Sequence, residues 1–121
     1  MTKEILQQLT YPEHLDIISG DMKERSKLQP FVMQGFSTLH NASATVGLLD
    51  AKTKELIALA IAVAAQCDGY IAFHTHDAMV AGASREEIMD AMGVAILMVG
   101  GPPVILPTYP IEASVNANKR Y

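Results

Sequence analysis

The segment from Leu56 to Ala65 constrains the fold most, because every residue in it is apolar. A helix that is hydrophobic on all faces has to be covered on all sides. The segment is about half as long as the ~20 residues that a membrane-spanning helix needs, so we expect protein to cover it. Residues 91–99 are nearly as apolar. Two such helices are difficult to cover within 121 residues, which favours a homo-oligomer over a monomer with a sheathed central helix.

Helix signals recur along the chain, whereas sustained strand alternation is absent, so the predicted class is all-α in a single domain over residues 1–121. Proline suits a first helical turn, Asp is a good N-cap, and the sequence from Ser84 to Glu87 is a capping box. Asp68 and Gly69 are expected to break the chain between two helices. The expected helices begin near Pro12 and then span about Pro30 to Asn41, Asp50 to Gln66, Tyr70 to Ala81 and Ser84 to Val99.

Composition excludes several classes of function. The net charge is -4 without a basic cluster, which argues against nucleic acid as a partner. No basic flank precedes an apolar run at the N-terminus, so we expect a cytoplasmic protein that does not associate with membranes. Cys67 is the only cysteine, which leaves a bridge between two chains as the only possible disulfide.

Glu55, Cys67 and His74 are the residues most suited to chemistry. Cys67 is expected at the start of a helix, where the positive end of the helix dipole favours a thiolate. His74 follows two turns later on the same face and is a natural proton acceptor near neutral pH. Glu55 lies at the entrance to the apolar helix and could orient the imidazole. Together these groups form a proton relay that could activate a nucleophile.

The relay requires the chain to reverse direction. Along one straight helix Glu55 and Cys67 would lie ~18 Å apart. A reversal at Asp68 and Gly69 would bring His74 level with about residues 61–62. More than a helical turn would still separate His74 from Glu55, so we expect helix tilt, a water molecule or another subunit to close the gap.

Each candidate residue also has a purely structural interpretation. Cys67 could be a small buried apolar residue and His74 a satisfied core histidine. His74 and His76 point about 200° apart on a helix, so they cannot share a zinc ion, and we expect no metal site and no cofactor. The other histidines are expected at the surface and the methionines in the core: His14 and His40, and Met79, Met89, Met92 and Met98.

The run from Lys54 to Ala78, followed by 81–88 and by Gly100-Gly101-Pro102, resembles the carboxymuconolactone decarboxylase family over residues 30–103. The alkyl hydroperoxidase D-like branch fits best, and its catalytic Glu, first Cys and His match Glu55, Cys67 and His74. Its second cysteine is replaced by Tyr70. The resemblance implies an all-helical trimer or hexamer and, for this branch, reduction of peroxides by a cysteine pair that a dithiol partner recycles. With Tyr70 in place of one cysteine, an external thiol or Cys67 of another subunit would have to resolve the oxidised Cys67.

Three functions are compatible with these residues. The first is a thiol-dependent peroxidase with an antioxidant role, using Cys67 with His74 and Glu55. The second is a cofactor-free acid–base enzyme acting on a small carboxylic acid or lactone, with His74 as base and Tyr70 or Glu55 assisting. It requires a cation in the pocket, supplied by Arg25 or Arg85 from outside the motif. The third is a non-catalytic oligomeric relative, which a closed site around Cys67 would favour.

Overall fold

The computed structural model describes residues 11–45 and 47–100, and within them all regular secondary structure is helical. This confirms the predicted all-α class. None of these helices is long and apolar enough to cross a membrane. The prediction that Pro107 and Pro110 interrupt any helix near the C-terminus falls outside the described residues. The helices are α2 (Tyr11–Leu28), α3 (Pro30–Ala44), α4 (Ala51–Ala64), α5 (Asp68–Val80) and α6 (Arg85–Val99).

Local sequence explains where two of the helices begin. Asp50 is the N-cap of α4, and its carboxylate accepts a hydrogen bond of 2.7 Å from the backbone N–H of Thr53. Ser84 and Glu87 form the expected capping box at the start of α6, because each side chain accepts a hydrogen bond from the other residue's backbone N–H. Both predicted helix starts are therefore confirmed.

The break between α4 and α5 lies earlier than the sequence indicated. Asp68 and Gly69 belong to the first turn of α5, and the reversal occurs at Gln66, whose φ of 55° is left-handed. An aspartate in a first turn is favoured by the helix dipole, so Asp68 starts the helix instead of ending one. Helix α3 also continues past Asn41 to Ala44, because the Asn41 carbonyl accepts a hydrogen bond from the Thr45 N–H.

Helices α4, α5 and α6 pack together, and we call them the core layer (51–99). The hydrophobic core cluster of this layer consists of Leu59, Ala62, Val63, Ile71, Ile88, Met92 and Ala95. The apolar helix α4 is only partly covered, since Ile57 and Ile61 remain 46% and 63% exposed. Met92 is in the core as expected, but Met98 is 74% exposed, so that part of the methionine prediction is wrong. Met98 lies in the last turn of α6, beyond the helix's last buried residue, Ala95.

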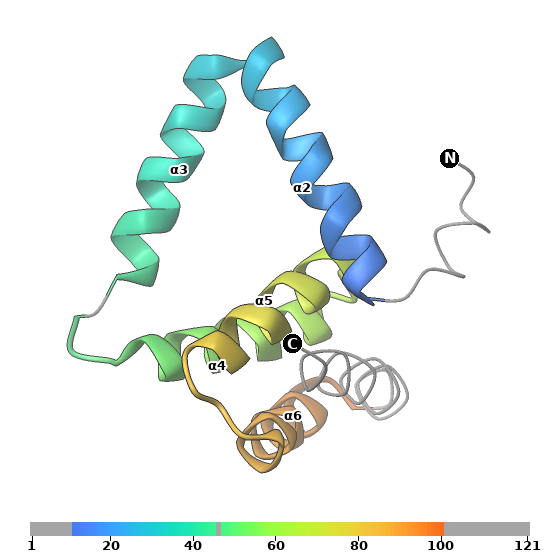
Figure 1. Ribbon diagram of the computed structural model, residues 1–121. Coiled ribbons are helices and arrows are strands. Elements are labelled where there is room, and N and C mark those ends of the chain that lie inside the picture. Colours follow the sequence, from blue (N-terminus) through green and yellow to red (C-terminus); the bar gives the residue numbers. More distant parts are fainter. Residues whose placement is uncertain (1–10, 46, 101–121) are drawn as a thin grey trace.

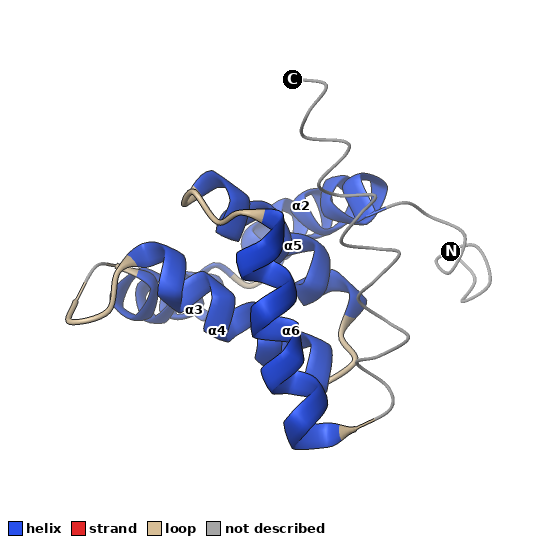
Figure 2. Cartoon of the chain, turned by 90° about the horizontal axis from the view of Figure 1, so that it is seen from below, coloured by secondary structure: helices blue, strands red, loops and turns tan. Residues whose placement is uncertain are grey.

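Helices α2 and α3 form an arch that rises from the core layer (Figure 1). They meet at the junction between Leu28 and Pro30 and form a triangle with α4 and α5 in Figure 1, whereas Figure 2 shows the same helices from below. Helix α2 packs against α5, while α3 touches α4 more lightly. A Cβ atom on Gly69 would lie 3.0 Å from Ile18 Cδ1, so glycine permits the close approach of α2 to α5.

Candidate functional site

Glu55 and His74 contact each other directly across α4 and α5. The Glu55 Oε2 and His74 Nδ1 atoms are 2.7 Å apart, and the two side chains are only 12% and 15% exposed. The predicted reversal of the chain is confirmed, but the predicted gap of more than one turn between Glu55 and His74 is wrong. Because the chain reverses at Gln66 and not at 68–69, the part of α4 that lies opposite His74 is near residue 58 and not near 61–62. Residue 58 is within one helical turn of Glu55.

Cys67 is the N-cap of α5, as its predicted place at a helix start required. Its side chain makes no capping hydrogen bond and is half-buried. Its carbonyl accepts a hydrogen bond of 2.9 Å from the Ile71 N–H, which closes the first turn. The thiol therefore lies at the N-terminal end of α5, where the first backbone N–H groups have no partner within the helix.

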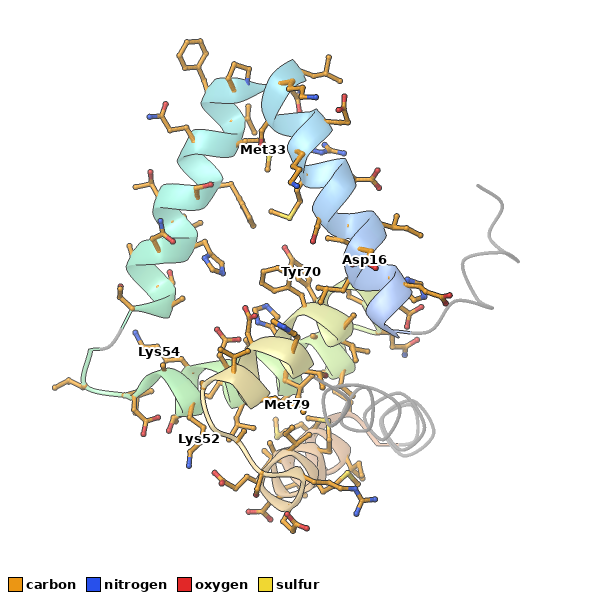
Figure 3. All side chains as sticks on the ribbon, viewed as in Figure 1. Asp16, Met33, Lys52, Lys54, Tyr70 and Met79 are labelled. Carbon is orange, nitrogen blue, oxygen red and sulfur yellow. The ribbon has the colours of Figure 1, made fainter. Side chains whose placement is uncertain are left out.

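Cys67 and His74 line the same pocket, which has a volume of about 510 Å³ and lies between the arch and α5. Figure 3 shows Tyr70 pointing from α5 into the space between α2 and α3. Glu55 is not among the lining residues, so it supports His74 from behind. The lining residues are Ile18, Met22 and Arg25 of α2, Met33, Phe36, Ser37, His40 and Asn41 of α3, and Cys67, Gly69, Tyr70, Phe73 and His74 at α5.

Aromatic rings surround the imidazole of His74. The Tyr70 ring is 5.7 Å from it and lies one turn earlier on α5, and the Phe73 ring is 5.4 Å away in an edge-on arrangement. Tyr70 is 51% exposed. Tyr70 also lines the pocket, where its hydroxyl is able to donate a hydrogen bond to a bound oxygen.

His40 was expected at the surface, and this prediction is wrong. Its ring is 6.2 Å from that of Phe73, and its Nε2 atom is buried with no hydrogen-bond partner among the described residues. His14 is also half-buried. The signal for His40 was its spacing of seven residues from Met33, which places both on the inner face of α3. This spacing alone does not predict burial, because the sequence does not reveal the arch.

Three side chains are close enough to hold a cation. Ligand atoms of Glu55, His74 and Asp77 lie within 4.8 Å of one another, a nitrogen and carboxylate set that zinc accepts. His76 is not part of this set, although its Nδ1 lies 3.1 Å from Asp77 Oδ1. A cation at these residues would displace the proton that Glu55 and His74 share.

The family model for the carboxymuconolactone decarboxylase family matches residues 30–105. A carboxymuconolactone decarboxylase family protein from Legionella pneumophila, solved in its apo form, is 39% identical to the chain. It superposes with a TM-score of 0.83 over 88% of this chain and 95% of that one. The chain belongs to the carboxymuconolactone decarboxylase family, as the resemblance indicated.

Curated relatives are uncharacterised proteins. One from Cupriavidus necator is 40% identical over 61% of this chain and 66% of its own length. Another from Haemophilus influenzae is 38% identical over 56% of this chain and 60% of its own length. The chain thus spans less than two thirds of the length of these two relatives. A third relative, protein 4 in the cox locus of Paracoccus denitrificans, is 36% identical over 69% of this chain and 75% of its own length.

Proposed function

We propose that the protein is a thiol-dependent peroxidase-type oxidoreductase of the alkyl hydroperoxidase D-like branch. The observation that carries this proposal is the direct contact of 2.7 Å between Glu55 and His74, behind a pocket that His74 shares with Cys67. Because His74 Nδ1 faces Glu55, its Nε2 is the nitrogen left to exchange a proton with the thiol, directly or through one water molecule. Glu55 stabilises the imidazolium that forms.

In the proposed reaction the Cys67 thiolate attacks the outer oxygen of a hydroperoxide. An S–O bond forms and the O–O bond breaks, so sulfur is oxidised to sulfenic acid and the peroxide is reduced to an alkoxide. The alkoxide takes the proton held by His74 and leaves as an alcohol. The hydroxyl of Tyr70, which is exposed to the pocket, can donate a hydrogen bond to the developing negative charge.

Recovery of the thiol has to use a reductant from outside the chain, because the sequence has no second cysteine to resolve the sulfenic acid. A small thiol attacks the sulfenic acid, forming a mixed disulfide and releasing water. A second thiol then attacks this disulfide, restores Cys67 and leaves with the first as an oxidised disulfide. The half-buried sulfur at the pocket wall is accessible to a small thiol in this scheme.

An acid–base reaction on a small carboxylated lactone is the second candidate, and one observation favours it. Arg25 lines the pocket with His74, so the cation that this function requires is present. This function ranks second because Arg25 comes from the arch, outside the two helices that carry the relay. Cys67, by contrast, lies at the junction between those two helices, α4 and α5. The pocket of about 510 Å³ beside Cys67 also argues against a closed, non-catalytic site.

The decisive experiment is to expose the protein to a hydroperoxide at neutral pH and measure its intact mass, with and without a small dithiol. A gain of one oxygen on Cys67, or a dimer linked through Cys67, that the dithiol reverses would support the peroxidase. Cys67→Ser should lose both products. If wild-type Cys67 stays reduced while peroxide is unconsumed, the peroxidase proposal is wrong, and lactone turnover becomes the next assay.

We further propose that the protein is a homo-oligomer. Several large apolar side chains are exposed on both the arch and α6, including Phe31 at 86% and Leu97 at 81%. Large apolar side chains exposed in such number are typical of subunit contacts. Sedimentation of the wild type should give a trimer or hexamer, and replacing Phe31 and Leu97 by Ser should lower the number of subunits. A wild-type monomer at micromolar concentration would contradict this.

A further inference from the structure

The α2 wall of the pocket runs away from the thiol in one straight line. Ile18, Met22 and Arg25 are spaced by four and three residues, so they share one face of the helix. Ile18 lies against Gly69, close to Cys67, because a Cβ at Gly69 would be 3.0 Å from Ile18 Cδ1. Arg25 is two turns further, which is ~10 Å along the helix axis. The guanidinium therefore marks the end of the pocket remote from the thiol.

The residues of α3 that line the pocket run along it in the same direction. Arg25 and Met33 are each four residues from Gln29 at the top of the arch, so they lie at a similar level. His40 lies two turns lower, where its ring contacts that of Phe73 in α5 at 6.2 Å. In Figure 3 Met33 lies near the top of the arch and Tyr70 points up from its base, which marks the two ends of the pocket.

The chemistry of the walls changes along this axis. At the base are Cys67, Tyr70 and His74, and the middle is apolar, lined by Met22 of α2 and Phe36 of α3. Arg25 is the only permanently charged residue among the described lining residues, and none of them is acidic. Within the described part of the chain, no ion pair neutralises the Arg25 side chain.

We propose that Arg25 anchors the carboxylate of a substrate whose apolar body fills the pocket and whose hydroperoxide lies at the opposite end, beside Cys67. This assignment of a substrate class rests on the proposed peroxidase function. A guanidinium binds a carboxylate through two parallel hydrogen bonds, which fixes the ligand's direction as well as its position. In this arrangement the carboxylate lies far from the hydroperoxide that reacts. In the acid–base reaction of the second candidate function, by contrast, the carboxylate is itself the leaving group.

Binding of a non-reactive probe tests the anchor without any redox chemistry. We expect octanoate to bind the full-length wild type about tenfold more tightly than octanamide, since a charge-assisted hydrogen bond contributes about 1.5 kcal/mol. Arg25→Gln should abolish this preference, whereas Lys23→Gln removes the same charge from α2 outside the pocket and should keep it. Calorimetry would measure both ligands. Equal binding of the two by the wild type, or an unchanged preference in Arg25→Gln, would overturn the proposal.

Two further measurements separate this inference from the peroxidase itself. Cys67→Ser should keep the octanoate preference, and an intact preference in a protein whose Cys67 never reacts with peroxide would refute the peroxidase and leave the anchor standing. If Cys67 does react, a hydroperoxide of a carboxylic acid should oxidise it about tenfold faster than the methyl ester, and Arg25→Gln should equalise the rates. Equal rates in the wild type would show that Arg25 does not select the substrate.

Discussion

The core layer and the arch are both helical, but they bury their side chains very differently. Leu59, Ile71 and Ile88 in the core layer are completely buried. In α3 the only buried residue is Met33, and apolar side chains such as Leu39 remain 65% exposed. The core layer is thus held by its own packing, whereas the arch contributes little buried area within one chain.

The core layer and the arch contribute different parts of the candidate site. The relay of Glu55 and His74 belongs entirely to the core layer, and Cys67 lies at its edge. The arch supplies the pocket's remaining walls, including Arg25 and His40. Reactivity and ligand selection are therefore expected to respond separately to substitution.

The largest effect on stability should come from the core layer. Ile71→Ala removes a fully buried side chain and should lower the free energy of unfolding by about 2–5 kcal/mol. Leu39→Ala, its counterpart in the arch, should change it by less than about 0.5 kcal/mol in dilute protein. Urea unfolding measures both. Similar losses in the two variants would mean that the arch is part of the same packed unit.

The second-largest effect should come from a substitution in the relay of Glu55 and His74. Glu55→Ala leaves the part-buried His74 Nδ1 without its partner, which we expect to lower the free energy of unfolding by about 1–3 kcal/mol and to slow oxidation of Cys67 by about tenfold. Binding of octanoate, which depends on the arch, should not change. Asp16→Ala, an exposed acidic residue of α2, is the control. If Cys67 were oxidised at the wild-type rate in Glu55→Ala, Glu55 would have no role in the reaction.

The cap of α6 should have a smaller effect confined to the core layer. Ser84→Ala removes the acceptor for the Glu87 N–H and should cost about 1 kcal/mol in thermal or urea unfolding. Ser19→Ala serves as the matched control, because its exposed hydroxyl bonds only to the preceding turn of α2. A larger loss in Ser19→Ala would reverse the expected ranking of the two regions.

The smallest effect should be a pH dependence at the contact between α4 and α6. The hydrogen bond from Lys52 holds the pKa of the Glu87 carboxyl below its ordinary value. The stabilisation is therefore complete above the ordinary glutamate pKa and disappears as the pH falls through the lower, folded-state pKa. Glu87→Gln, which retains the capping side chain, should have a slightly lower Tm at pH 7 and the wild-type Tm in acid. A difference that persists in acid would rule out this pair as its cause.

Local signals in the sequence were sufficient for much of the fold. The caps at Asp50 and Ser84 act within a few residues, so they could be identified from spacing alone. The reversal was misplaced because Asp68 and Gly69 have typical turn composition, while Gln66 adopts the left-handed conformation that the packing of α4 on α5 requires. That shift of a few residues decided whether Glu55 could reach His74.

The sequence by itself determined the helices, the candidate residues Glu55, Cys67, Tyr70 and His74, and the family, because apolar periodicity, caps and a motif of fixed spacing are local properties. Only the tertiary structure decided that α2 and α3 stand away from the core layer, and that Arg25 and His40 face the motif across a shared pocket. The physical reason is that amphipathic spacing identifies the inner face of a helix but does not specify which other helix that face meets.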